Sequence, residues 1–260
     1  MSASKVKSDW NPGAYSRFRD LRARPALDLL LAVRTVGGGD VVDLGCGNGA
    51  MGPSLRERFA GHGIVGVDAS PAMLGKAGES GAYDRLDEAD IAGWETKRAG
   101  LIYSNAALHW LGDHEALFPK LVGMLAKGGT LAVQMPHQNN APSHRLWVSL
   151  AEELFPGRVD TESGPGVMTP PRYFHLLSGL GQFALWETEY YQVLGADASG
   201  HPVRRFTEST YARPILDLLA ADEQAALIAR YEAVMEKAYP RGEDGTVLFP
   251  FRRMFFTVSV

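Results

Sequence analysis

The chain has 260 residues, a formal net charge of -4, and a content of 45% hydrophobic and 22% charged residues. These values are ordinary for a globular protein with a sizeable core, and the acidic balance argues against a broad electrostatic grip on nucleic acid. One cysteine excludes an internal disulfide, no apolar run approaches the ~18 residues of a membrane span, and the polar start is not a secretory signal. We therefore expect a cytoplasmic protein that binds neither membrane nor nucleic acid.

The first half of the chain alternates between predicted helices and strands. Helices are expected over about 25–33 and 52–59, after Ser70-Pro71, and from Asp113 to the Gly128-Gly129 pair. The last of these helices carries Leu117, Leu121 and Leu125 at fourfold spacing. Strands are expected at 41–44, 64–67, 100–104 and 130–135. This alternation predicts an α/β fold, in which a parallel sheet has helices on both faces.

The second half departs from plain alternation. Helices are expected at 141–155 and 171–180, a surface excursion at 156–171, a long strand at 183–193, and a β-rich end at 246–260. Residues 195–240 hold two predicted helical stretches, the second over 222–239. Two late strands joined by a helical insertion indicate an antiparallel sheet edge. We interpret the insertion as a lid over the active site, and the alternative is that its helices only extend the core.

A glycine-rich motif follows the first predicted strand, with Asp43 before Gly45, Gly47 and Gly49. Glycines here remove every Cβ that would keep a ligand from the backbone, and the next helix offers free N–H groups. Gly45, Gly47 and Ala50 also match the looser pattern G-x-G-x-x-G/A, so a nicotinamide-dependent oxidoreductase is one interpretation. A carboxylate at Asp43 repels a pyrophosphate, however. The motif favours S-adenosylmethionine, which has a sulfonium, an amino group and no phosphate.

Two more carboxylates follow the motif. Asp68 stands about 20 residues after the glycines, where an acidic side chain accepts from ribose hydroxyls. Together these segments resemble the class I S-adenosylmethionine-dependent methyltransferases. The resemblance implies that Asp90 accepts from the adenine amino group and that the backbone of Ile91 meets a ring nitrogen, although Asp90 is alternatively a solvated loop acid. The cofactor-binding residues expected on these grounds are Asp43, Gly45, Cys46, Gly47, Asp68, Ala69, Asp90, Ile91 and Asn105, with Cys46 a small filler rather than a nucleophile.

Residues 106–111 follow Asn105 at the end of a central strand, beside the glycine loop. We therefore expect this segment to face the reacting methyl group. His109 and Trp110 in this run are candidates for the wall of the adenine or acceptor pocket. Core packing is an equal alternative for Trp110. For His109, a polar wall is favoured over a catalytic base.

The resemblance extends beyond the cofactor motifs. Residues 8–12, 24–26, 70–73, 88–91, 117–119, 132–136, 190–191 and 213–214, and the tail around Phe251 and Arg253, are similar to the trans-aconitate 2-methyltransferase family. The resemblance implies one methyltransferase domain over 1–260: a class I, Rossmann-like three-layer sandwich with a mostly parallel seven-stranded sheet, an antiparallel edge strand and a helical lid. Residues 1–25 are then an active-site cover, and 195–240 are the lid. The chain departs from the family pattern at 137–141 and 158–169.

The implied reaction esterifies one carboxylate of trans-aconitate. It needs no general base, because a carboxylate with an ordinary pKa of about 4 is already ionised at neutral pH. No catalytic side chain and no metal are expected, whereas arginines and hydroxyls are needed to hold a tricarboxylate. The candidate substrate-binding residues are Tyr15, Arg22, Arg24, His109, Trp110, Gln134, Tyr191, Arg213 and Arg253. The alternative is a methyltransferase for another small-molecule or carrier-bound carboxylate. We expect a monomer or a weak homo-oligomer.

Overall fold

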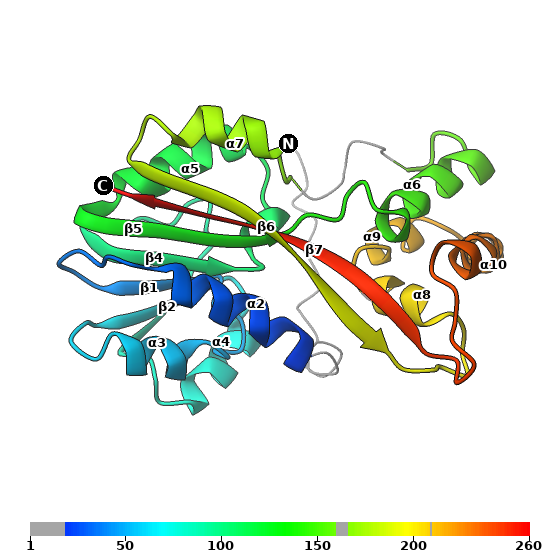
Figure 1. Ribbon diagram of the computed structural model, residues 1–260, viewed down its shortest axis with the longest axis horizontal. Helices are drawn as coiled ribbons and strands as arrows, with labels where there is room; N and C mark the ends of the chain where they lie inside the picture. The colour runs from blue at the N-terminus through cyan, green and yellow to red at the C-terminus, as the bar shows by residue number, and fades with distance from the viewer. Residues whose placement is uncertain (1–18, 160–165, 209) are drawn as a thin grey trace. The chain divides into compact units, whose positions relative to one another are not determined.

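The computed structural model describes residues 19–159, 166–208 and 210–260 (Figure 1). Tyr15 and most of the expected cover at 1–25 lie outside these residues. The chain divides into two compact units. The first contains the chain up to Met135, Gly166–Trp186 and Met254–Val260, and the second contains the chain from Pro136 to Pro165 and Glu187–Arg253.

A seven-stranded sheet organises the fold, with the strand order β3-β2-β1-β4-β5-β7-β6. The strands are β1 Val41–Leu44, β2 Ile64–Asp68, β3 Arg85–Glu88, β4 Ala99–Asn105, β5 Leu125–Pro136, β6 Gln182–Leu194 and β7 Val247–Ser259. Strands β3, β2, β1, β4 and β5 are mutually parallel, and the late strands form an antiparallel edge. The strand order reverses between β1 and β4, which is where open α/β sheets bind ligands. The predicted fold class is confirmed.

Helices of the first unit lie on both sides of its strands. They are α2 Arg19–Ala32, α3 Gly52–Arg58, α4 Pro71–Glu79, the short η1 Leu108–Trp110, α5 His114–Gly123 and α7 Pro170–Leu177. Helix α2 contacts β4, and α3 and α4 contact β2, whereas α5 contacts α7 along the opposite side (Figure 1). Ser70 caps α4 by accepting from the Met73 amide at 3.3 Å, and Asp113 caps α5 by accepting from the Ala116 amide at 3.2 Å. Both predicted caps are confirmed.

The core of the first unit is apolar and aromatic. All four residues of β1 are buried, as are the first six of β4. Phe118 of α5, Tyr173 of α7 and Phe256 of β7 pack with ring centroids 5.1–5.6 Å apart. Burying one large apolar side chain contributes about 1.5–3 kcal/mol, so this cluster holds α5 and α7 against the sheet.

The structure differs from the prediction at several elements. Helix α2 runs through Pro25 and has begun by Arg19, instead of starting at the proline. Helix α5 ends at Gly123, and Leu125 pairs with Ala99 of β4, so sheet hydrogen bonding overrides the helical spacing of the leucines. Among the described residues the insertion holds three helices instead of two, because its first stretch is divided into Pro202–Glu208 and Arg213–Leu216.

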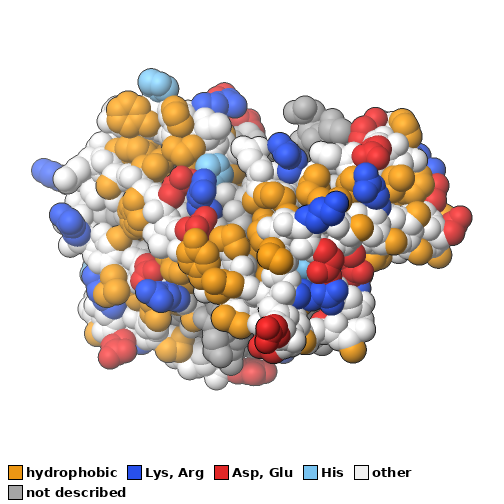
Figure 2. All heavy atoms as spheres, turned by 45° about the vertical axis from the view of Figure 1, so that its right-hand side comes forward, with side chains coloured by type: hydrophobic (Ala, Val, Ile, Leu, Met, Phe, Trp, Pro, Cys, Tyr) orange, Lys and Arg blue, Asp and Glu red, His pale blue; other side chains and the backbone are white. Residues whose placement is uncertain are grey.

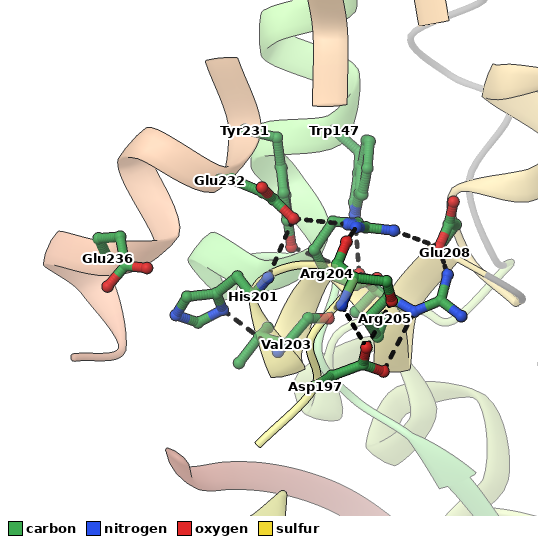
Figure 3. Close-up of polar contacts among 12 residues, drawn as sticks. Trp147, Asp197, His201, Val203, Arg204, Arg205, Glu208, Tyr231, Glu232 and Glu236 are labelled. Atoms are coloured by element: carbon green, nitrogen blue, oxygen red, sulfur yellow. Dashed lines mark hydrogen bonds and ion pairs between the residues drawn. The ribbon is translucent and has the colours of Figure 1, made fainter. Parts of the chain in front are cut away.

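The second unit contains α6 Pro142–Leu154, α8 Pro202–Glu208, α9 Arg213–Leu216 and α10 Ala221–Ala238. Helix α10 packs on α6 and α8, and the rings of Trp147 and Tyr231 stack with centroids 3.9 Å apart. Arg204 is buried beside this stack and donates to Glu232 and to Glu208, each at 2.7 Å (Figure 3). Packing and charge-assisted hydrogen bonds therefore join α8 to α10.

Charges of both signs are interspersed on the face of the molecule shown in Figure 2. Within the described residues, no helix combines the length and the apolar character needed to cross a lipid bilayer.

Candidate active site

The glycine loop leaves the carboxyl end of β1 in a conformation that favours glycine. Gly45, Gly47 and Gly49 have φ values of +77°, +54° and +75°. A Cβ on Gly45 would lie 2.2 Å from the Ala107 Cβ, and one on Gly49 would lie 2.7 Å from the Ala77 Cα. A Cβ on Gly47 would meet nothing within 4 Å, so the loop presents open backbone there. Side chains are therefore excluded at two positions by packing, and the third position leaves space for a ligand.

Asp68, at the end of β2, fixes the loop. One carboxylate oxygen accepts from the Gly47 amide and the other from the Ser70 amide, both at 2.9 Å. The amides of Gly45 and Cys46 donate to the carbonyl of Val67 at 2.8 and 2.9 Å. Because a carboxylate oxygen accepts more than one hydrogen bond, Asp68 retains acceptor capacity for the hydroxyls of a ribose.

Asp43 is buried within β1, with only 3% of its surface exposed. Its carboxylate accepts from the hydroxyl of Tyr83 at 2.7 Å. Burial raises the pKa of Asp43 to about 7, the Tyr83 hydrogen bond opposes this rise, and the charge of Asp68 adds to it. Asp43 therefore changes protonation near neutral pH, and a cation bound beside it would favour the ionised form.

Tyr83 is the residue of this site that the sequence prediction missed. Its ring packs against glycines of the loop, of α3 and of β2, since a Cβ on Gly49, Gly52 or Gly66 would lie 2.6–3.0 Å from it. Tyr83 therefore packs against the loop with its ring and donates to Asp43 with its hydroxyl. No spacing pattern connects Tyr83 to Asp43, which lies 40 residues earlier in the chain, so the sequence carried no signal for this contact.

The remaining cofactor candidates surround the same loop. Ile91 reaches Gly45, with its Cδ1 3.4 Å from the point where a Cβ on that glycine would lie. Asp90 is exposed and accepts from the Ala92 amide at 3.0 Å, while Ala69 is exposed beside Asp68. The side-chain oxygen of Asn105, at the end of β4, is buried without a hydrogen-bond partner among the described residues. These groups fit a nucleoside with a cationic amino-acid portion, because they combine open backbone, uncompensated carboxylates and an unused acceptor.

The surroundings of Cys46 support its interpretation as a small packing residue rather than a nucleophile. Its side chain is buried beside Leu74 and Ala77, and burial together with the charges of Asp43 and Asp68 raises the pKa of its thiol. A thiol that stays protonated is a poor nucleophile. The described residues contain no group of three or more His, Cys, Asp or Glu side chains arranged to hold a metal.

Several acceptor candidates lie in the first unit. Gln134 is fully buried on β5 and pairs in register with Asn105 of β4. His109 is buried on η1, and its ring lies 4.5 Å from that of Trp110, which is 40% exposed. Arg24 is exposed on α2, and the side chain of Arg22 lies outside the described part of that helix.

A buried hydrogen-bond chain supports the segment that carries His109. The Nε2 of His114 lies 2.9 Å from the carbonyl oxygen of Leu108, and its Nδ1 lies 2.6 Å from the hydroxyl of Tyr173. Because the carbonyl only accepts, Nε2 carries the proton and Nδ1 accepts from Tyr173. The Met168 amide donates to the same hydroxyl at 3.2 Å, so η1, α5 and the start of α7 are tied together.

The other acceptor candidates lie in the second unit. Arg253 is buried on β7, with its guanidinium 4.7 Å from the centre of the Phe251 ring. Arg213 is about half exposed and forms an ion pair of 3.8 Å with Asp217. Tyr191 is 62% exposed. The structure therefore gathers the cofactor candidates around one loop, whereas the acceptor candidates are divided between the units.

The sheet order and the loop geometry together define a class I S-adenosylmethionine-dependent methyltransferase. The methyltransferase domain family matches residues 15–162. The fold is that of the YcgJ protein from Bacillus subtilis (TM-score 0.57, 13% identity, 91% of this chain and 98% of that one). The same fold occurs in geranyl diphosphate C-methyltransferase from Streptomyces coelicolor (TM-score 0.51, 16% identity, covering 99% of this chain and 88% of that one).

Sequence relatives narrow the class. The chain is 39% identical to a trans-aconitate 2-methyltransferase of Variovorax paradoxus, over 96% of this chain and 98% of that one. It is equally identical to a trans-aconitate 2-methyltransferase of Escherichia coli, over 95% and 97%. The chain belongs to the trans-aconitate 2-methyltransferase family. This membership sets aside the nicotinamide-dependent alternative that the glycine pattern had left open.

Proposed function

We propose that this protein transfers the methyl group of S-adenosylmethionine to one carboxylate of trans-aconitate and releases the monomethyl ester. The observation that carries this proposal is the 39% identity over 96% of the chain. The similarity extends past residue 162, where the match to the general methyltransferase domain ends. The acceptor is thus inferred from a similarity that includes the part of the chain beyond this domain.

The residues around the glycine loop hold the cofactor in this proposal. Bound S-adenosylmethionine supplies a methyl group activated by the sulfonium. Asp43 binds the amino group, Asp68 the ribose hydroxyls, and Asp90 with the backbone of Ile91 the adenine. Asn105 binds the methionine portion, and its unpartnered buried oxygen supports this role. Gly45, Cys46, Gly47 and Ala69 provide close approach to the backbone.

The protein contributes binding and orientation to the chemical step. The acceptor carboxylate is ionised at neutral pH, so no side chain has to remove a proton. Orienting its oxygen in line with the methyl group, at about 3 Å, supplies on the order of 7–11 kcal/mol of the barrier reduction. The cations and hydrogen-bond donors proposed to hold the acid are Tyr15, Arg22, Arg24, His109, Trp110, Gln134, Tyr191, Arg213 and Arg253.

Access to the donor and cellular context are also part of this proposal. Residues 195–240 act as a lid and 1–25 as a cover, because a transferase on this scaffold must exclude water from the donor.

The protein acts in the cytoplasm on a small acid, as a monomer or weak homo-oligomer, without nucleic acid or membrane.

The test is an initial-rate comparison with labelled S-adenosylmethionine and four acids: trans-aconitate, cis-aconitate, isocitrate and citrate. We expect trans-aconitate to have the highest kcat/KM and to yield a base-labile labelled ester. Faster labelling of another acid would reassign the acceptor within the same reaction class. Labelling of none of them, with S-adenosylhomocysteine still bound, would refute the proposed acceptor class.

A further inference from the structure

The segment between β4 and α5, which contains η1, has a strained backbone at both ends. Ala106, at its start, has a φ of +53°, and Asp113, which caps α5, has a φ of +49°. Residues with a side chain rarely adopt this left-handed conformation, and such strain persists only where the surrounding structure fixes it. The contacts that fix the segment are therefore candidates for a functional role.

The start of the segment packs beside the candidate cofactor residues. A Cβ on Gly45 would lie 2.2 Å from the Cβ of Ala107, so the segment and the glycine loop approach closely. The Ala106 amide donates to the carbonyl of Gln134 on β5 at 2.9 Å. These contacts hold the start of the segment at the carboxyl ends of the parallel strands.

Two other parts of the chain hold the backbone of η1 itself. The Leu108 carbonyl accepts from Nε2 of His114 at 2.9 Å, and the His109 carbonyl accepts from the Gly166 amide at 3.0 Å. Gly166 approaches so closely that a Cβ there would lie 2.3 Å from the carbonyl oxygen of Leu111. The orientation of η1 therefore depends on α5 and on the residues that precede α7.

Tyr173 of α7 fixes the hydrogen bond that His114 makes. Its hydroxyl lies 2.6 Å from Nδ1 of His114 and accepts from the Met168 amide at 3.2 Å. Because Nε2 donates to a carbonyl, Nδ1 accepts from the tyrosine hydroxyl, and the ring must be neutral. Burial lowers the pKa of His114, which favours this neutral ring. Both side chains are buried, so a lost partner would leave a polar atom without water to replace it.

We propose that His114 and Tyr173 are positioning residues for methyl transfer. Through the Leu108 carbonyl they hold η1, and with it the side chains of His109 and Trp110, in place at the acceptor. This inference rests on the proposed function, in which His109 and Trp110 bind the acid. Neither His114 nor Tyr173 touches the acid, and both act through the backbone of η1. A displacement of about 1 Å in such a positioning group can cost on the order of a hundredfold in rate.

The test compares the wild type with Tyr173→Phe by initial rates and by amide hydrogen exchange. The variant loses only the hydroxyl and keeps the ring, whose centroid lies 5.6 Å from that of Phe118 and 5.3 Å from that of Phe256. We expect kcat/KM for trans-aconitate to fall about tenfold or more. The amides of residues 107–112 should exchange about tenfold faster, because η1 opens more often. The Kd for S-adenosylhomocysteine should not change, since the glycine loop has its own hydrogen bonds to β2.

Thr130→Val is the matched control for loss of a buried hydroxyl. The Thr130 hydroxyl donates to the Thr35 carbonyl at 2.8 Å, so its removal should also lower Tm. Thr130 pairs in register with Leu101 of β4, toward the end of the strands opposite the glycine loop. Its kcat/KM should therefore match that of the wild type. An equal fall in kcat/KM in both variants would assign the loss to stability alone and overturn the inference.

Two variants of His114 separate its hydrogen bonds from its bulk. A glutamine side chain offers both a donor and an acceptor, whereas a leucine side chain offers neither. His114→Gln should therefore retain more of the wild-type kcat/KM than His114→Leu does. Equal losses in the two variants would show that the ring acts only by packing and would overturn the inference.

The rate comparison requires a wild type that forms the ester. If it does, an unchanged kcat/KM or an unchanged exchange rate in Tyr173→Phe would overturn the inference and leave the proposed function intact. A wild type that binds S-adenosylhomocysteine but forms no ester would instead refute the proposed function, and the exchange rates would still decide whether Tyr173 holds η1.

Discussion

The glycine loop of the first unit and the α8–α10 cluster of the second both bury charge, but they treat it in opposite ways. At the loop, Asp43 and Asp68 are satisfied by a tyrosine hydroxyl and by backbone amides, and no ion pair neutralises them among the described residues. In the cluster, Arg204 and Arg205 are neutralised by Asp197, Glu208 and Glu232 (Figure 3). We propose that the loop reserves its carboxylates for a cationic ligand, whereas the carboxylates of the cluster are paired with arginines of the fold.

This difference distinguishes charges proposed to bind a ligand, at the loop, from charges that pair within the fold, in the cluster. Arg205, which is close in sequence to the acceptor candidate Arg213, donates to Asp197 at 3.3 Å and to Glu208 at 2.7 Å. Its charge is therefore already compensated within the fold. Removing a charge should cost folding stability in the cluster and cofactor affinity at the loop, and both losses can be measured.

The largest effect is expected in the cluster. Arg204→Met should lower the free energy of unfolding by about 3 kcal/mol, because it leaves the partly buried Glu232 without the cation it pairs with, while Glu208 retains Arg205. The measurement is urea unfolding followed by circular dichroism. Arg230→Met is the matched control, since Arg230 of α10 forms an exposed 3.7 Å pair with Glu153. The control should lose less than about 1 kcal/mol. Equal losses in the two variants would show that the buried cluster has no special structural role.

The next effect is expected at the loop. Asp68→Ala removes the acceptor for the Gly47 and Ser70 amides and the proposed ribose contact. Affinity for S-adenosylhomocysteine should fall about a hundredfold, in line with the loss of two hydrogen bonds to a charged group. Isothermal titration measures it. Glu88→Gln, at the exposed β3 residue that pairs in register with Asp68, is the control and should bind normally. Retained affinity in Asp68→Ala would contradict the assignment of Asp68.

The pH dependence of cofactor binding tests Asp43. Its pKa of about 7 in the free protein means that a proton must leave before a cation binds at lower pH. The Kd for S-adenosylmethionine should therefore rise about tenfold per pH unit between about pH 6 and pH 5. Titrations in buffers of different ionisation enthalpy would detect the released proton. A Kd that is flat over this range would remove Asp43 from the binding site.

The same carboxyl has the opposite influence on folding. Because its pKa is raised on folding from 3.8, the folded state binds the proton more tightly than the unfolded state does. Its contribution to stability is therefore present below about pH 4 and is lost as pH rises through about 7. Asp43→Asn should be more stable than the wild type at pH 8 without cofactor, and thermal unfolding measures the difference. A variant that is less stable at pH 8 would contradict the uncompensated burial of Asp43.

The smallest effect is expected for Tyr83→Phe. The variant keeps the ring that packs on the glycines and loses the hydroxyl that lowers the pKa of Asp43. The pH midpoint of cofactor binding should move upward by a fraction of a pH unit, while the affinity well above that midpoint changes little. The pH titration used for Asp43 measures this shift. A midpoint that moves downward would show that Tyr83 does not stabilise the ionised form.

Much of the geometry of the candidate cofactor site was predictable because its determinants are local in the sequence. Asp43, the glycines and the Ser70 cap follow from residue types at fixed spacing beside predicted strands. Tyr83 was not predictable, since its contact with Asp43 depends on how β1 and β3 are brought together. The end of α5 was predicted wrongly, because the pairing of Leu125 with Ala99 is a tertiary contact that competes with a helical pattern.

The acceptor side was harder to predict for a similar reason. The sequence pointed to the pair at 190–191. It did not indicate which of these two adjacent residues lies on the buried face of β6. The structure buries Tyr190 and exposes Tyr191, and nothing in the alternation itself distinguishes the two faces, so the acceptor role of Tyr191 stays a prediction. Likewise, Arg204 and Arg205 look equivalent to other arginines until their carboxylate partners on α8 and α10 are known.

The glycine loop of the first unit is proposed to serve methyl transfer to a carboxylate of trans-aconitate. Mass spectrometry of a reaction that contains purified protein, S-adenosylmethionine and trans-aconitate would measure this transfer itself. We expect one monomethyl ester for each S-adenosylhomocysteine formed, and far less ester with Asp68→Ala at a cofactor concentration near the Kd of the wild type. S-adenosylhomocysteine formed without an ester, or no turnover by protein that binds both ligands, would contradict the proposed reaction.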